Sequence, residues 1–215
     1  MYLPKQFEET RTEVLHGLVR ERPFGTLVVM TSEGLSVDHI PFLIDETPGP
    51  FGVLRGHVSR ANPILKSTLL DVDAVAIFQG PDHYITPSWY ATKKETGKVV
   101  PTWNYVVVHA YGRPMFIDDE QWLRTHVNHL TQHHEDARDP AWRVSDAPED
   151  FISKLIGGIV GVEMPVARLS GKWKLGQNRP DADRLGMVDG LLREHEGSAD
   201  ALAALTRNSG NGVST

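Results

Sequence analysis

The stretch VPTWNYVVVHAYG, residues 100–112, holds polar and aromatic side chains on both sides of a short apolar run. The apolar run is Val106, Val107 and Val108, and the residues around it are Thr102, Trp103, Asn104, Tyr105 and His109. A strand that serves packing alone would alternate valine with simple polar residues such as lysine or threonine. The composition therefore predicts a strand against which a flat ligand with a polar rim can lie.

Further strands are predicted on both sides of this stretch. Residues 26–31 and 35–45 are separated by Ser-Glu-Gly, which is typical of a hairpin, and the turn sequence TPGP leads into a third run at 51–59. Residues 73–80 and 83–90 indicate two more strands. Six or more strands in series with short connections favour a mainly β fold with α, an antiparallel barrel rather than a doubly wound parallel sheet.

Helices are predicted to flank these strands. The spacing of apolar residues and the capping signals place them at 7–21, 61–70, about 119–137, about 148–158 and 182–195. The helix at 182–195 forms a C-terminal helical extension, and residues 196–215 are predicted to be a flexible tail. A chain of 215 residues holds one full-sized core, so residues 1–195 are predicted to form a single domain.

Composition restricts the classes of function. The chain has 22 Lys and Arg against 28 Asp and Glu, a formal net charge of −6, which disfavours a protein whose affinity rests on neutralising DNA phosphates. It has no cysteine, so disulfides, zinc–thiolate sites and thiol nucleophiles are excluded. No segment approaches 18 apolar residues and the N-terminus lacks a secretory pattern, so we expect a cytoplasmic protein without membrane contact.

The chain departs from two nucleotide-binding signatures and from one metal-binding signature. ETGKVV lacks the glycine and hydroxyl of a phosphate loop, and IGGIVG lacks the first glycine of a dinucleotide fingerprint. His126, His129 and His133 share a face of the helix predicted at 119–137, but solvent-exposed histidines are common on helices and no H-E-x-x-H motif occurs. The sequence therefore predicts no metal site, although ligation of a metal or haem by this cluster stays open.

The segment LRGHVSRANP, residues 54–63, carries candidate groups for binding an anion. They are Arg55, His57, Arg60 and Asn62, at the end of a predicted strand and the start of a predicted helix. Free backbone N–H groups at a helix N-terminus and neighbouring arginines can hold a phosphate through charge-assisted hydrogen bonds. The alternative is a capped helix with two surface arginines, and the segment alone does not decide between them.

Two further segments combine rings with polar groups. Residues 84–105 contain five Tyr and Trp side chains together with Ser88, Lys98, Thr102 and Asn104, which suits stacking on a heterocycle and bonding to its polar edge. An aromatic-lined core or a dimer contact is the alternative. Residues 169–179, LSGKWKLGQNR, place Lys174, Gln177 and Arg179 close to Trp173, a density of donors that is unusual for a bare turn.

In combination these segments resemble the PaiB family of FMN-binding negative transcriptional regulators, a group of the flavin-binding split-barrel class. The resemblance spans nearly the whole chain and is carried most specifically by PSWY, PTWNY and GKWKLGQNR in that order. The family usually has serine where this chain has Gly176. The resemblance implies an antiparallel split β-barrel that forms a homodimer, with FMN in clefts built from both chains and an interface well above ~2,000 Å².

The resemblance also implies roles for the candidate residues. Arg55, Arg60 and Lys98 are candidates for the FMN phosphate, and Trp103, Asn104, Lys174 and Gln177 for the ring and its polar edge. The full predicted cofactor site is Arg55, His57, Arg60, Asn62, Ser88, Lys98, Thr102, Trp103, Asn104, Lys174, Gln177 and Arg179. No catalytic residue is predicted.

Three functions remain open at this stage. The first is FMN-dependent redox chemistry on a small molecule, with the protein anchoring and orienting the cofactor. The second is a ligand-responsive transcriptional regulator without turnover, although no helix–turn–helix pattern is present. The third is haem binding or handling, through His57 or a histidine of the 119–137 helix.

Overall fold

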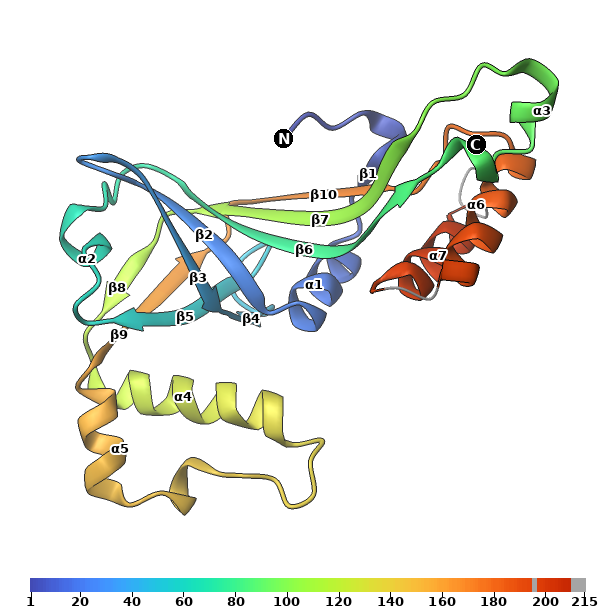
Figure 1. The fold of residues 1–215 in the computed structure, drawn as a ribbon. Helices are drawn as coiled ribbons and strands as arrows, with labels where there is room; N and C mark the ends of the chain where they lie inside the picture. Colours follow the sequence, from blue (N-terminus) through green and yellow to red (C-terminus); the bar gives the residue numbers. More distant parts are fainter. Residues whose placement is uncertain (195–196, 210–215) are drawn as a thin grey trace. The chain divides into compact units, whose positions relative to one another are not determined.

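The computed structural model describes residues 1–194 and 197–209, which form two antiparallel sheets and surrounding helices (Figure 1). The six-stranded sheet has the order β1 (Glu8–Glu9), β10 (Arg168–Lys174), β7 (Thr102–Gly112), β6 (Ala74–Ile85), β2 (Phe24–Thr31) and β3 (Gly34–Pro41). The four-stranded sheet has the order β4 (Leu43–Asp45), β5 (Val53–Ser59), β9 (Ile159–Pro165) and β8 (Met115–Ile117). The predicted series of antiparallel strands is thus confirmed, with the quoted stretch as the long strand β7.

The described helices are α1 (Thr12–Glu21), α2 (Ile64–Ser67), α3 (Thr92–Thr96), α4 (Glu120–Glu135), α5 (Glu149–Ile156), α6 (Asp181–Glu194) and α7 (Ala199–Asn208). Each of the five predicted helices has a counterpart among the described residues, with different bounds, and α3 and α7 are additional. The first helix begins at Thr12 because Glu8 and Glu9 pair with β10 as strand β1. The segment after β5 forms only the short helix α2, and the Asn62 Oδ1 accepts the Ile64 N–H at 3.1 Å.

Strand β6 corrects another expectation, because residues 74–85 form one strand of 12 residues where the sequence indicates two. Gly80 and Pro81 have the composition of a break. Proline removes one backbone donor, but its fixed φ is compatible with extended backbone, so the strand continues through it.

The described chain falls into two compact units, and the single domain expected over residues 1–195 stays a prediction. Unit 2 comprises residues 12–78 and 109–169 and contains the whole four-stranded sheet. Its core includes Leu27, Leu54, Phe78 and Met164 from the two sheets, together with Phe42 from the link between β3 and β4. The Phe42 and Phe78 rings meet edge to face, with centroids 5.8 Å apart.

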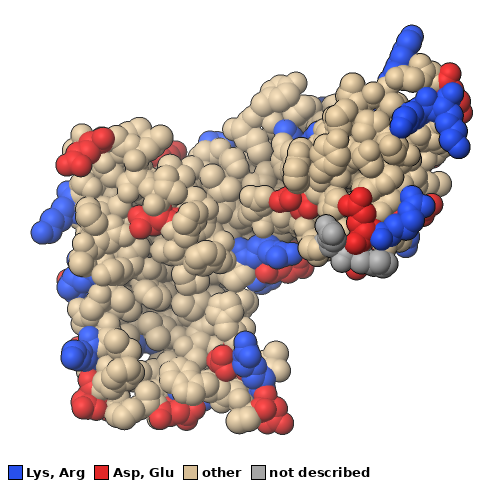
Figure 2. Space-filling model, in the orientation of Figure 1, with Lys and Arg blue, Asp and Glu red and all other residues tan. Residues whose placement is uncertain are grey.

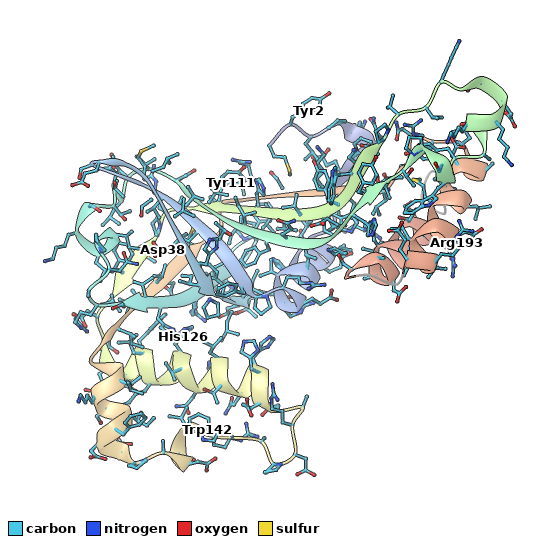
Figure 3. All side chains as sticks on the ribbon, in the orientation of Figure 1. Tyr2, Asp38, Tyr111, His126, Trp142 and Arg193 are labelled. Carbon is cyan, nitrogen blue, oxygen red and sulfur yellow. The ribbon has the colours of Figure 1, made fainter. Side chains whose placement is uncertain are left out.

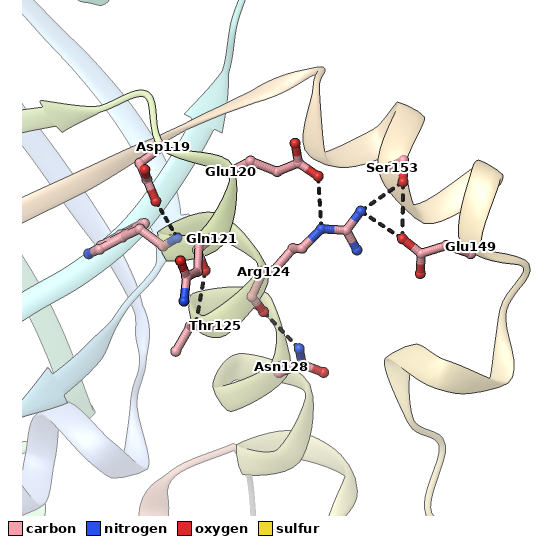
Figure 4. A network of polar contacts seen from close by, with 9 residues as sticks. Asp119, Glu120, Gln121, Arg124, Thr125, Asn128, Glu149 and Ser153 are labelled. Atoms are coloured by element: carbon pink, nitrogen blue, oxygen red, sulfur yellow. Dashed lines mark hydrogen bonds and ion pairs between the residues drawn. The ribbon is translucent and has the colours of Figure 1, made fainter.

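Helices α4 and α5 of unit 2 pack against β9 through a small apolar cluster. Leu123, Ile152 and Ile156 are buried there, with Trp122 packed against them. A Cβ atom at Gly161 of β9 would lie 2.3 Å from the Trp122 ring, so only glycine lets the ring lie on this strand. Figure 4 shows Arg124 linking the two helices, with hydrogen bonds and ion pairs to Glu120, Glu149 and Ser153.

Unit 1 comprises residues 1–11, 79–108 and, as far as the chain is described, 170–194 and 197–209. Its helices α6 and α7 pack against one another, and Leu191 and Leu202 are fully buried. The prediction of a flexible tail over 196–215 is therefore wrong for 199–208, which form α7; residues 196 and 210–215 lie outside the described residues. Within the described ranges, no helix is both long and apolar enough to cross a membrane.

Candidate functional site

Four of the sequence-predicted residues line one cleft of unit 1. Thr102 and Asn104 come from β7, Lys174 ends β10, and Arg179 follows the turn after it. The cleft has a volume of about 200 Å³ and is also lined by Tyr90 and Met187. The Lys174 ammonium donates hydrogen bonds to Thr102 Oγ1 at 2.5 Å and to the Trp103 carbonyl oxygen at 2.7 Å. The antiparallel register thus brings together groups that lie about seventy residues apart in sequence.

The charges around this cleft are partly buried. Burial lowers the pKa of Lys174, and the nearby cations Lys172 and Arg179 lower that pKa further. The Arg179 guanidinium lies over the Tyr90 ring, 4.7 Å from its centroid. Tyr90 is 3% exposed, burial raises the pKa of its hydroxyl, and that hydroxyl has no hydrogen-bond partner among the described residues. The cleft therefore has cationic and neutral donors in excess of the acceptors around it.

Asn104 is a second donor that is poorly satisfied. It is buried, and its amide Nδ2 donates to the Met187 sulfur at 3.7 Å, which is a weak acceptor. Next to it on β7, Trp103 is 55% exposed, and its ring meets the exposed Tyr84 ring edge to face at 6.1 Å between centroids. Successive side chains of a strand point to opposite faces, so the exposed Trp103–Tyr84 pair lies outside the lining of the cleft that Asn104 faces.

Three other predicted residues of unit 1 have local roles. The Gln177 amide accepts from the Leu175 N–H and donates to the Trp173 carbonyl, which closes the turn around Gly176. Gly176 has φ +81°, and a Cβ there would meet Met187 at 2.4 Å, so a glycine fits this turn where the family usually has serine. Ser88 accepts a hydrogen bond from Lys93, and Lys98 is exposed after α3.

The remaining four predicted residues belong to unit 2, and both arginines among them are ion-paired. Arg55 contacts Asp45 and Glu163, each at 2.8 Å, and these hydrogen bonds raise its pKa despite burial. Arg60 forms a bidentate pair with Asp118 and also donates to two backbone carbonyls. Their role in binding phosphate stays a prediction, and it requires that the carboxylate partners be displaced.

Asn62 and His57, the other two, line a second cleft of about 600 Å³ within unit 2. The Asn62 amide donates to Asp38 Oδ1 at 2.8 Å. His57 Nδ1 lies 3.2 Å from His126 Nε2, so the two imidazoles share one hydrogen bond. Figure 3 shows His126 on α4.

His126 also lines a groove of about 740 Å³ along α4, with His129 and His133. Its ring stacks on Trp122, and it is 4% exposed with Nδ1 lacking a partner among the described residues. Burial lowers its pKa to about 4, with further contributions from His57, Arg55 and His129. In the part of the chain that the structure describes, no group of three or more His, Cys, Asp or Glu has a geometry that could hold a metal ion.

Sequence reasoning missed several contributors to the unit 1 cleft. Tyr90 stands in a segment that the sequence singles out, but its buried position is decided by the fold. Met187 belongs to α6, and no local signal connects it with β7. Asp183 is buried and accepts both hydrogen bonds from Thr92, so it braces the loop that carries Tyr90.

Comparison with known proteins identifies the family. Residues 1–168 match the family described as "Putative FMN-binding domain". An uncharacterised protein of Aspergillus fumigatus is 35% identical over 89% of this chain and 90% of its own length. The protease synthase and sporulation protein PAI 2 of Bacillus subtilis is 30% identical over 95% of this chain and 96% of its own length.

Solved structures of low sequence identity share the fold. The flavocytochrome Anf3 of Azotobacter vinelandii has a TM-score of 0.58 at 16% identity, covering 78% of this chain and 69% of that one. The FAD and heme binding protein of Mycobacterium smegmatis has a TM-score of 0.57 at 16% identity, covering 85% of this chain and 80% of that one. The predicted antiparallel split β-barrel with flanking helices is thereby confirmed. The chain therefore belongs to the PaiB family of FMN-binding split-barrel proteins, and FMN is its cofactor.

Proposed function

We propose that this protein is an oxidoreductase that uses FMN for two-electron chemistry on a small molecule. The observation that carries the proposal is the cleft of unit 1, where Thr102, Asn104, Lys174 and Arg179 converge; the exposed Trp103 lies on the same strand, β7. The hydrogen-bond donors of this cleft outnumber the acceptor atoms that the described residues offer them. Such a site suits a ligand with several acceptor atoms.

The residues of this cleft fit FMN in chemistry but enclose only part of it. Pockets that bury a cofactor-sized ligand are typically about 300–1,000 Å³, whereas this cleft measures about 200 Å³. A second surface is needed to cover the rest of the cofactor. We propose that a second copy of the chain supplies it, which makes the protein a homodimer with shared flavin clefts.

FMN supplies hydride transfer when it is bound, and the chain supplies its position and its electrostatic surroundings. The Lys174 ammonium keeps Thr102 and the Trp103 carbonyl in place through its two hydrogen bonds. Trp103 offers an exposed ring for stacking, while Asn104 and Arg179 offer N–H groups to acceptor atoms. A cation beside the cleft stabilises negative charge that develops on a ligand within it.

Turnover tests this function. The full chain, saturated with FMN and mixed anaerobically with a reduced nicotinamide, is expected to lose the visible absorbance of oxidised flavin and to regain it when an oxidant is admitted. FMN at the same concentration without protein is the control, because free flavin reacts slowly by itself. Bound FMN that is reduced no faster than the free cofactor would contradict the proposal.

The same spectra separate the alternatives. A regulator without turnover would bind FMN without accelerated reduction, and its DNA contacts would need a basic surface. Figure 2 shows Lys and Arg side chains at the end of unit 1 that carries α3, with acidic side chains among them. Haem binding is favoured by one observation, the groove along α4 with His129 and His133, and it would appear as a Soret band on haem titration.

A further inference from the structure

Three cations of unit 1 stand close to one another. They are Lys172, Lys174 and Arg179, called here the cation trio; Lys174 and Arg179 line the cleft, and both Lys172 and Arg179 lower the pKa of Lys174. Lys172 is only 8% exposed, and its ammonium lies 5.3 Å from the centroid of the Tyr105 ring. The Lys174 ammonium lies 6.0 Å from the same ring. Placing like charges in partly buried positions near one another costs free energy unless an opposite charge joins them.

The chain itself does not provide that opposite charge. Among residues 1–194 and 197–209, no carboxylate forms an ion pair with any member of the trio. Glu8 stands opposite Lys172 in the β1–β10 register without pairing to it. Burial and the negative charge of Asp183 raise the pKa of the Tyr90 hydroxyl, but the Asp183 carboxylate already accepts two hydrogen bonds from Thr92. The trio instead makes hydrogen bonds to neutral oxygens and lies over aromatic rings.

The neutral hydrogen-bond donors of the cleft also lack good acceptors. The Tyr90 hydroxyl is buried without a partner among the described residues, and the Asn104 amide has only the Met187 sulfur. A buried donor without an acceptor destabilises the site, because it has lost its hydrogen bonds to water without gaining others. Tyr90, Asn104 and Arg179 all line the same cleft, so a single ligand with several oxygen atoms could accept from more than one of them.

From these two observations we infer that the unit 1 cleft is an anion-binding site that takes a phosphate group. A phosphate monoester brings two negative charges and several acceptor oxygens, which matches Lys174 and Arg179 in the cleft lining, Lys172 close to Lys174, and two under-used donors. The volume of about 200 Å³ suits a phosphate with its first attached atoms better than a whole isoalloxazine ring. The phosphate belongs to FMN or to a separate small phosphate compound; the first source rests on the proposed function, and the second does not.

Isothermal titration of the full chain with three ligands tests the inference: FMN, riboflavin, and inorganic phosphate. The variants are Arg179→Gln, which removes one charge of the trio, and Arg179→Lys, which keeps the charge but not the paired N–H geometry. Arg193→Gln is the matched control, because Arg193 is exposed on α6, also in unit 1, and lies outside the cleft lining (Figure 3). Unfolding by heat is recorded for every variant, so that a folding defect is separated from lost binding.

If FMN provides the phosphate, Arg179→Gln weakens FMN on the order of 10- to 100-fold, and Arg179→Lys by less. Riboflavin affinity stays constant in all variants, and inorganic phosphate competes with FMN. If a separate compound provides it, inorganic phosphate binds wild type and the Arg193→Gln control, and it binds Arg179→Gln at least 10-fold more weakly. In that case the affinities of FMN and riboflavin do not differ from one another.

Failure of the inference is distinct from failure of the proposed function. An absence of flavin binding would overturn the proposed function, while the inorganic phosphate arm would still decide on the anion site. Inorganic phosphate that does not bind, together with FMN and riboflavin that respond equally to Arg179→Gln, would overturn the inference even if the bound flavin turns over.

Discussion

Replacing Leu202 with alanine is expected to lower the free energy of unfolding of unit 1 by about 2–5 kcal/mol, the usual cost of emptying a well-packed leucine site. Leu202 lies on α7 and is 0% exposed, and α7 packs against α6. Chemical unfolding followed by tryptophan fluorescence measures the change, because the Trp89 ring packs on Gly190 of α6 and reports on that helix.

Arg207→Ala is the control for this prediction, since Arg207 is exposed on the same helix. A surface substitution of this kind typically changes stability by less than ~0.5 kcal/mol. Equal and small effects of both substitutions would mean that residues 199–208 do not pack as α7 does here, and that the tail predicted from sequence describes the protein in solution.

The second large effect is the loss of stability in acid caused by the buried pair His57 and His126. The pKa of His126 is about 4 in the folded chain, against 6.5 for an ordinary histidine, so folding favours the neutral ring. The contribution of neutral His126 to the free energy of unfolding is fully present above about pH 6.5 and is lost as the pH falls toward 4. A difference of about 2.5 units corresponds to roughly 3 kcal/mol.

His126→Gln is expected to flatten the fall in unfolding free energy between pH 7 and pH 4 by that amount, because glutamine does not titrate. The groups that act on His126 are His57, whose pKa burial also lowers, Arg55 and His129. His134→Gln is the matched control on the same helix, since His134 is exposed. If the unfolding free energies of wild type, His126→Gln and His134→Gln fall with the same slope between pH 7 and pH 4, the pair His57 and His126 does not cause the loss of stability in acid.

The sequence predicted the elements whose signals are local. Residues 100–112 contain a continuous valine run with polar neighbours, and the structure has the long strand β7 there. The helix predicted at 119–137 begins after Asp119, whose carboxylate accepts the Trp122 N–H at 2.7 Å. Residues 199–208 were missed because a helix this short depends on its packing, here against α6, and no local signal shows that packing.

Part of the candidate site could also be predicted, because some of its residues stand in segments with strong local signals. PTWNY and GKWKLGQNR are dense in donors, and Thr102, Asn104, Lys174 and Arg179 meet at one cleft. Arg55 and Arg60 present the opposite case, because the carboxylates that pair with them include Glu163 and Asp118, which are distant in sequence. Only tertiary structure could show that both guanidinium groups are already engaged.

The central claim is that two copies of this chain hold FMN together, and sedimentation velocity recorded in the visible flavin band tests it most directly. The chain alone has a mass of 23.9 kDa. The account predicts that, at micromolar protein, flavin absorbance sediments as one boundary of twice that mass with one FMN for each chain. Flavin that sediments with a 23.9 kDa monomer, or that remains free while the chains sediment without it, would contradict the account.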